Sequence, residues 1–189
     1  MRPWIAFFSQ TGTEIHNLCS ALGIYPDAIV TNKTTTEGVN QDLLTTTTFR
    51  TQKLNRTIWH VLPSKPTLEN YNKVLSKFNN PVITLHGYLR IIPKEICDKY
   101  QIYNLHPGLI DQFPSLKGFN PQERAFKEGY NVAGCVIHKV TSEVDEGEIL
   151  LSQGVSIKGL TLPQVYSVLH EVAFDLWKSL FTGYKILEK

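Results

Sequence analysis

The stretch "PWIAFFSQTGTEIHNLCSALGIYPDAIVTN", residues 3–32, decides the fold class. It begins with a short apolar and aromatic run, Trp4 to Phe8, that predicts a buried strand. A loop of small polar residues follows, and then a segment whose apolar residues share one face of a helix that ends at Gly23. Residues 27–32 predict a second strand. Strand, helix and strand in this order form a βαβ unit, which implies a parallel sheet.

Strands and helices continue to alternate through the first half of the chain, and the middle is rich in strands. Residues 33–57 are rich in Thr, Asn and Gln without a clear period, so we predict a polar loop and leave open a short strand or helix inside it. Further strands are predicted at 58–61, 81–88, 101–108, 132–141 and 147–157, and helices at 67–78, 93–100, 120–129 and 161–186. We expect one domain over residues 1–189, a three-layer, Rossmann-like α/β fold whose mostly parallel mixed sheet is flanked by helices.

Composition excludes several classes of protein. Hydrophobic residues make up 42% of the chain and charged residues 19%, which is typical of a globular protein. A net charge of +2 gives no electrostatic reason to expect nucleic acid or an anionic membrane as a partner. No apolar run approaches the length of a membrane span, and the apolar run near the start is too short for a signal peptide. Three cysteines without a CxxC pair predict neither disulfides nor a zinc site, so the cytoplasm is the simplest compartment.

The segment "YNLHPG", residues 103–108, holds the first candidate catalytic residues. Asn104 and His106 are two positions apart, so in an extended chain their side chains point to the same side. An amide donor beside an imidazole suits attack on a carbonyl, because the amide stabilises an oxyanion and the imidazole moves a proton near neutral pH. A turn with a structural histidine is the alternative, and these residues alone leave both open. No serine or cysteine nucleophile lies beside them, so a covalent triad is not indicated.

Two further loops follow predicted strands. The loop before the first helix offers backbone N–H groups that can bind an anion, although it lacks the GxGxxG and Walker patterns and a plain turn is the alternative. The loop 141–147 is acidic; it is either a solvated turn or a source of a carboxylate that faces an imidazole and raises its pKa. We interpret His138, which alternates with Ile137 on a strand, as structural. The other histidines lack metal-ligand spacing, so we predict no metal.

Together these motifs resemble the folate-dependent formyltransferases. The resemblance rests on "NLHPGL" at 104–109 followed by "HKVTSEVDEGEILLSQ" at 138–153, and it covers nearly the whole chain. "LHGYLRIIP" at 85–93 lies where that family has its pteridine-binding segment. "FSQTGTEI" at 8–15 and "VTNK" at 30–33 lie where the glycinamide ribonucleotide transformylases have a phosphate loop and the second strand.

The resemblance implies 10-formyltetrahydrofolate as co-substrate and a primary amine as acceptor. Asn104 would donate a hydrogen bond to the developing oxyanion, and His106 would stabilise that charge and pass a proton to the departing folate nitrogen. Asp145 would hold His106 and, through water, help to remove the proton of the amine. The implied folate-binding residues are Leu85, Leu89, Arg90, Ile91, Ile92, Val140, Thr141, Glu143 and Val144. The implied acceptor-binding residues are Gly12, Thr13, Glu14 and Glu171.

The chain departs from the family pattern on the acceptor side. Glu14 replaces an asparagine of the phosphate loop, and its charge would repel a phosphate unless the side chain points away. The segment "KGFNPQERAF" at 117–126 is more similar to methionyl-tRNA and sugar-amine formyltransferases than to the nucleotide enzymes.

The expected function is therefore formyl transfer to a primary amine, with glycinamide ribonucleotide of purine biosynthesis preferred. The alternatives are another amine such as an amino sugar or a modified nucleotide, hydrolysis of the formyl donor, and folate binding without catalysis. Transfer to initiator tRNA is disfavoured, because the sequence has no second, basic domain. We expect a cytoplasmic enzyme with a small-molecule partner, no nucleic acid and no membrane. The oligomeric state and the role of residues 33–57 are not predicted.

Overall fold

The computed structural model describes residues 1–48 and 57–188. The chain divides into two compact units, one made of residues 1–102 with the C-terminal segment from Lys185, and the other of residues 103–184. No helix in the described ranges is long and apolar enough to cross a membrane.

The first unit is built on four parallel strands in the order β3-β2-β1-β4. Every residue of the three inner strands is buried, because each strand is covered on both faces, whereas β3 at the edge has exposed residues at both ends. The bounds are β1 Trp4–Phe8, β2 Ala28–Thr31, β3 Ile58–Val61 and β4 Val82–Leu85.

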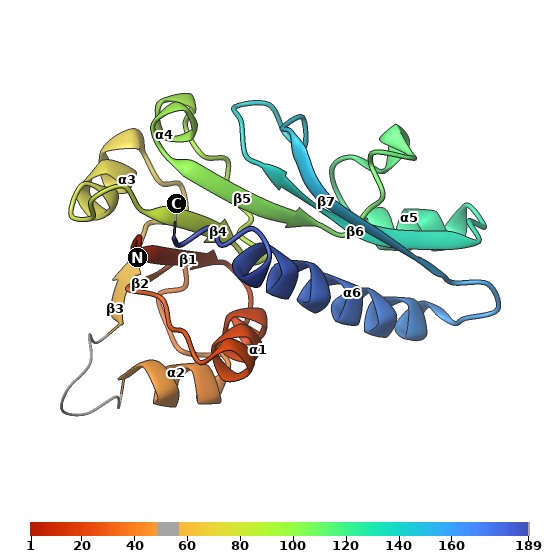
Figure 1. Ribbon diagram of the computed structural model, residues 1–189, viewed down its shortest axis with the longest axis horizontal. Helices are drawn as coiled ribbons and strands as arrows, with labels where there is room; N and C mark the ends of the chain where they lie inside the picture. Colours follow the sequence, from red (N-terminus) through yellow and green to blue (C-terminus); the bar gives the residue numbers. More distant parts are fainter. Residues whose placement is uncertain (49–56, 189) are drawn as a thin grey trace. The chain divides into compact units, whose positions relative to one another are not determined.

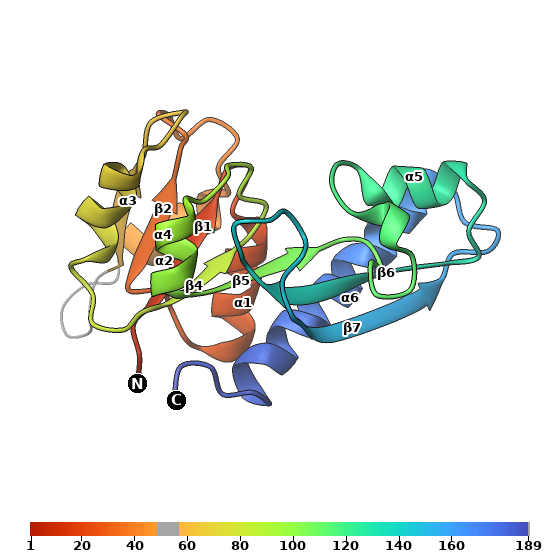
Figure 2. The same cartoon turned by 90° about the horizontal axis from the view of Figure 1, so that it is seen from above.

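Helices cover both faces of this sheet. Figures 1 and 2 show α1 and α2 on one face and α3 and α4 on the other. Right-handed crossovers dictate this division, because the strand order first runs outward from β1 to β3 and then returns to β4. The bounds are α1 Thr13–Leu22, α2 Gln41–Thr48, α3 Leu68–Leu75 and α4 Lys94–Lys99.

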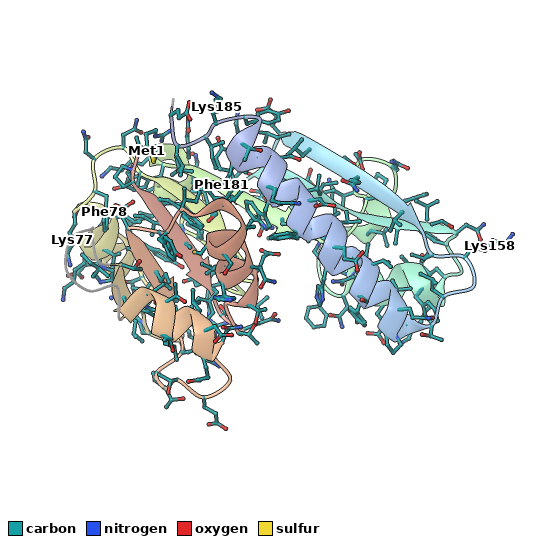
Figure 3. The ribbon with its side chains drawn as sticks, turned by 60° about the horizontal axis from the view of Figure 1, so that its bottom comes forward. Met1, Lys77, Phe78, Lys158, Phe181 and Lys185 are labelled. Atoms are coloured by element: carbon teal, nitrogen blue, oxygen red, sulfur yellow. The ribbon has the colours of Figure 1, made fainter. Side chains whose placement is uncertain are left out.

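The second unit is an antiparallel sheet with the order β5-β6-β7, against which α6 packs (Figure 1). Figure 3 shows the side chains along α6, with Phe181 near its C-terminal end and Lys158 in the turn before it. The bounds are β5 Gln101–His106, β6 Val132–Lys139, β7 Ile149–Ser156, α5 Pro121–Lys127, α6 Leu162–Thr182 and the 3₁₀ helix η1 Pro114–Leu116. The buried face of α6 consists of Val165, Leu169, Val172, Ala173, Leu176, Trp177, Leu180 and Phe181.

The strands and helices follow the predicted order, and the polar region holds one of the short elements that the prediction left open. The polar region at 33–57 contains the helix α2, and the prediction for residues 49–56 lies outside the described part of the chain. Asn40 caps α2 by accepting a hydrogen bond from the Leu43 amide, and threonine hydroxyls of α2 donate to carbonyls four residues earlier. The closing helix ends at Thr182, earlier than predicted. The prediction of one domain over 1–189 stays a prediction.

Candidate active site

The register of the second unit's sheet brings predicted and unpredicted residues together. Asn104 and His106 lie two positions apart on β5, and the β5–β6 register places His138 opposite Asn104. Asp145 lies in the connection between β6 and β7. Asp145 has a φ of 56°, which is left-handed backbone that aspartate tolerates better than most residues. These four side chains form a cluster, which we call the Asn-His-Asp-His cluster.

His106 is buried and has an acceptor facing each ring nitrogen. Its Nε2 lies 2.8 Å from the carbonyl oxygen of Leu116, and its Nδ1 lies 3.3 Å from Oδ2 of Asp145. Because a carbonyl oxygen only accepts, the proton of the neutral ring is on Nε2. Nδ1 is then the basic nitrogen, and it faces a carboxylate.

Polar groups face the Asp145 carboxylate from three directions. Its Oδ2 accepts a hydrogen bond of 2.9 Å from the Gly118 amide and faces His106, while its Oδ1 lies 3.5 Å from Nε2 of His138. The side chain is only 8% exposed. A buried carboxylate is stable when donors satisfy it in this way, so Asp145 can remain ionised at the end of the loop.

His138 connects Asn104 with Asp145. Its Nδ1 lies 2.8 Å from its neighbour's carbonyl oxygen and therefore carries a proton. Its Nε2 lies 3.2 Å from Nδ2 of Asn104. Nε2 of His138 therefore accepts from the Asn104 amide and fixes its orientation, and it also faces Oδ1 of Asp145. The prediction that His138 is merely structural therefore misses its contact with two of the predicted catalytic residues.

The charges of this cluster shift the pKa values of its members. Burial lowers the pKa of His106, the Asp145 carboxylate and the Leu116 carbonyl offset part of this effect, and His138 and Arg124 add to the lowering. Burial alone would raise the pKa of Asp145, but the hydrogen bond from His138, the charge of His106 and the Gly118 amide together hold it below its usual value. Near neutral pH the cluster presents a carboxylate and a mostly neutral imidazole, a pair that can accept a proton, next to an amide donor.

The predicted acceptor residues of the first unit lie at the start of α1. Gly12 is the N-cap with a φ of 73°, and Thr13 begins the helix. Glu14 does not extend freely from the first turn, because its Oε1 lies 2.5 Å from Nδ1 of the buried His86. Nε2 of His86 in turn lies 2.8 Å from the Thr84 hydroxyl. The sequence did not indicate this Glu14–His86 pair.

The predicted folate residues of the first unit follow β4. Leu85 and Ile92 are buried, whereas the apolar side chains of Leu89 and Ile91 are 56% and 76% exposed. The Leu89 amide donates to the Ser9 hydroxyl, which fixes the segment's backbone. Exposed apolar side chains on a fixed backbone suit contact with a flat aromatic ligand, and their role in folate binding stays a prediction.

The predicted ligand residues of the second unit lie in the loop after β6 and on α6. The Thr141 hydroxyl donates to the carbonyl of Glu143, which tightens the loop, and Val144 is 61% exposed. Val140 follows the last residue of β6, and Glu171 is exposed on α6. These residues have no role assigned by their contacts, and their part in binding stays a prediction.

The sequence matches the Formyl transferase family over residues 5–176. The chain is a member of this family. That membership confirms the resemblance drawn from the motifs at 104–109 and 138–153.

Relatives of this formyl transferase include proteins of different length. Human trifunctional purine biosynthetic protein adenosine-3 is 37% identical over 87 residues, which are 45% of this chain and 8% of that protein. Methionyl-tRNA formyltransferase of Caldicellulosiruptor saccharolyticus is 37% identical over 92 residues, or 48% and 29% of the two chains. Phosphoribosylglycinamide formyltransferase of Bacillus subtilis is 30% identical over 102 residues, or 52% and 51%. The matched region thus spans about half or less of each relative.

Solved structures share the fold over the full length of the chain. Glycinamide ribonucleotide transformylase 1 from Geobacillus kaustophilus has a TM-score of 0.79 at 19% identity and covers 99% of both chains. Phosphoribosylglycinamide formyltransferase from Bacillus halodurans has a TM-score of 0.76 at 21% identity and covers 100% of both. The predicted α/β fold class is confirmed.

Sequence reasoning named three members of the Asn-His-Asp-His cluster in this formyl transferase and missed the backbone groups that hold them. The Leu116 carbonyl and the Gly118 amide bind His106 and Asp145. Every residue has a carbonyl, and every residue except proline has an N–H group, so no residue type signals their use. A signal for His138 was present in the sequence, because a histidine on the strand that pairs with the Asn104 strand can lie opposite Asn104.

Proposed function

We propose that this protein is an enzyme that transfers the formyl group of 10-formyltetrahydrofolate to a primary amine, with glycinamide ribonucleotide as the acceptor. The observation that carries the proposal is the Asn-His-Asp-His cluster, in which an amide donor, a basic imidazole nitrogen and an ionised carboxylate lie within hydrogen-bonding reach of one another. Membership of the Formyl transferase family supports it. We propose residues 1–189 as one catalytic domain, which places the activity in the step of purine biosynthesis that formylates this nucleotide.

The reaction begins when the amine attacks the formyl carbon and a carbon–nitrogen bond forms. The formyl oxygen becomes negatively charged, and the Asn104 amide, oriented by His138, donates to it. Nδ1 of His106 takes the proton that the amine nitrogen loses, and the Asp145 carboxylate stabilises the resulting imidazolium. The oxyanion then re-forms the carbonyl while the bond to N10 of the folate breaks, and the same proton passes to that nitrogen. The products are the formylated amine and tetrahydrofolate, and no step uses a metal.

The test measures tetrahydrofolate release by absorbance after the protein is mixed with 10-formyltetrahydrofolate and glycinamide ribonucleotide. We expect release only when the amine is present. Removing the oxyanion donor with Asn104→Ala, or the base with His106→Ala, should lower kcat by on the order of 10² to 10³. Release without amine would identify a hydrolase. Ligand binding without release for any amine would identify a folate-binding protein.

A second candidate is transfer to an amine without a phosphate. The Glu14–His86 pair favours it, since a carboxylate already lies in the first turn of α1, where a phosphate would otherwise be attracted. A panel of phosphorylated and unphosphorylated primary amines distinguishes the two. Turnover of an unphosphorylated amino sugar with none of glycinamide ribonucleotide would select the second candidate.

A further inference from the structure

Arg124 on α5 binds three carbonyl oxygens of one short segment, Ser115 to Phe119. Its Nε donates to the carbonyl of Phe119 at 3.0 Å and its Nη2 to the carbonyl of Lys117 at 2.7 Å. Its Nη1 donates to the carbonyl of Ser115. The guanidinium thus uses all three nitrogens on alternate residues of this segment, which we call the 115–119 segment.

The backbone groups between these carbonyls bind the catalytic residues. The Leu116 carbonyl accepts from His106 at 2.8 Å, and the Gly118 amide donates to Asp145 at 2.9 Å. Gly118 has a φ of 82°, a conformation that favours glycine. The 115–119 segment therefore contacts Arg124 through one set of backbone groups and the catalytic pair through the other.

We propose that Arg124 is a positioning residue, which fixes the 115–119 segment so that the Leu116 carbonyl stays on His106 and the Gly118 amide stays on Asp145. The expected effect of Arg124 on catalysis rests on the proposed function. Its expected effect on the cluster rests on geometry alone. The Leu116 carbonyl keeps the proton of neutral His106 on Nε2, which leaves Nδ1 as the base. Arg124 would thus select the reactive tautomer without touching substrate.

The planar shape of the guanidinium, and not only its charge, is needed for this role. A lysine ammonium is a single point of charge and cannot reach three carbonyls at fixed angles. The charge of Arg124 has a separate effect. Burial is the main cause of the lowered pKa of His106; the charges of His138 and Arg124 lower it further, and the charge of Asp145 raises it. Replacing arginine by lysine separates the two effects.

The first experiment compares Arg124→Met and Arg124→Lys with the control Lys127→Met. Lys127 lies on the same helix, and its ion pair is with Glu123, so the control removes a positive charge of α5 that does not bind the 115–119 segment. We expect both Arg124 variants to lower kcat by on the order of 10²-fold while KM for 10-formyltetrahydrofolate changes little. The control should keep the wild-type kcat. Full activity of Arg124→Lys would overturn the positioning role.

The second experiment needs no turnover. In wild-type protein labelled with ¹⁵N, we expect the Gly118 amide to resist hydrogen exchange and the ring nitrogen shifts of His106 to report the proton on Nε2. Both Arg124 variants should lose the protection and mix the two tautomers. Unchanged signals in both variants would overturn the proposal, as would changed signals with unchanged kcat. If wild-type protein formylates no amine but the signals still change, the positioning stands and the proposed function fails. If Arg124→Met does not fold, Arg124→Lys carries both experiments.

Discussion

At the scale of single residues, His138 decides how the amide of Asn104 is presented. An asparagine amide can rotate by half a turn at little cost, which would exchange its donor for an acceptor. Nε2 of His138 accepts from Nδ2 of Asn104, because its Nδ1 proton is already used on a backbone carbonyl. The donor side of the amide is thereby fixed before substrate binds, and a preorganised donor is what stabilises an oxyanion.

Replacing His138 should therefore impair catalysis more than folding. His138→Leu removes the acceptor that fixes the Asn104 amide, so we expect kcat to fall by on the order of 10-fold or more. His138→Gln can still accept through its amide oxygen and should retain more activity. Steady-state kinetics check this, with His170→Gln, an exposed histidine of α6, as control. Equal kcat for His138→Leu and wild type would contradict the role.

The lowered pKa of His106 makes the stability of the folded protein depend on pH. Its folded pKa is lowered, chiefly by burial, so the unfolded chain, with a pKa near about 6.5, binds the proton more readily. The stability that His106 contributes is present above the unfolded pKa and is lost as pH falls through the folded pKa. Asp145, whose pKa is also lowered, acts in the same direction at lower pH. Urea unfolding should show that the free energy of unfolding falls between about pH 7.5 and about pH 5.5. This fall should be smaller in His106→Gln than in wild type.

The pKa of His60 is lowered as well, by burial and by the charge of Lys77. His60 lies in the first unit, so His60→Gln removes a second share of the same pH dependence without disturbing the Asn-His-Asp-His cluster. An unchanged loss of stability in His106→Gln would refute the assignment to His106.

At the scale of helices and strands, the sequence predicts elements that depend on apolar pattern and fails where polar contacts decide. β1 was predictable because its residues are all apolar, and β4 because it is apolar except at Thr84; such runs suit strands that are buried on two faces. α2 was not, because threonine disfavours helix interiors, and the bonds that its hydroxyls make to carbonyls of the same helix leave no pattern in the sequence. Asn104 and His106 were predictable from spacing along one strand, whereas His138 required the register between two strands.

Thr47 connects α2 with the sheet of the first unit. Its buried hydroxyl donates to the Leu43 carbonyl at 2.6 Å and accepts from Nε1 of Trp59 at 3.0 Å. Thr47→Val keeps the shape but leaves the indole N–H without this acceptor, so the free energy of unfolding should fall by about 1–3 kcal/mol. Thr45→Val removes the same kind of helix bond at an exposed position and should change it by less than about 0.5 kcal/mol. Denaturant unfolding compares the two, and equal losses would contradict the role of Trp59.

At the scale of the whole molecule, two groups of interacting polar side chains belong to different compact units. The Asn-His-Asp-His cluster belongs entirely to the second unit, and the Glu14–His86 pair belongs entirely to the first. Each group is held by contacts within its own unit. Changes to the pair should therefore alter the choice of acceptor and its KM, and changes to the cluster should alter kcat.

Glu14→Gln tests this division. The variant removes the negative charge from the first turn of α1 while its amide can still bond to His86, so the partial positive charge of the helix start becomes available to an anionic acceptor. We expect KM for glycinamide ribonucleotide to fall by about twofold to fivefold with kcat unchanged, and KM for an unphosphorylated amine to stay the same. Asp42→Asn is the matched control, because Asp42 is the acidic residue in the first turn of the neighbouring α2. If Asp42→Asn lowers KM for the nucleotide as much as Glu14→Gln does, the effect is one of general charge. If Glu14→Gln instead lowers kcat, Glu14 acts in the chemistry itself and the two units do not divide the functions in this way.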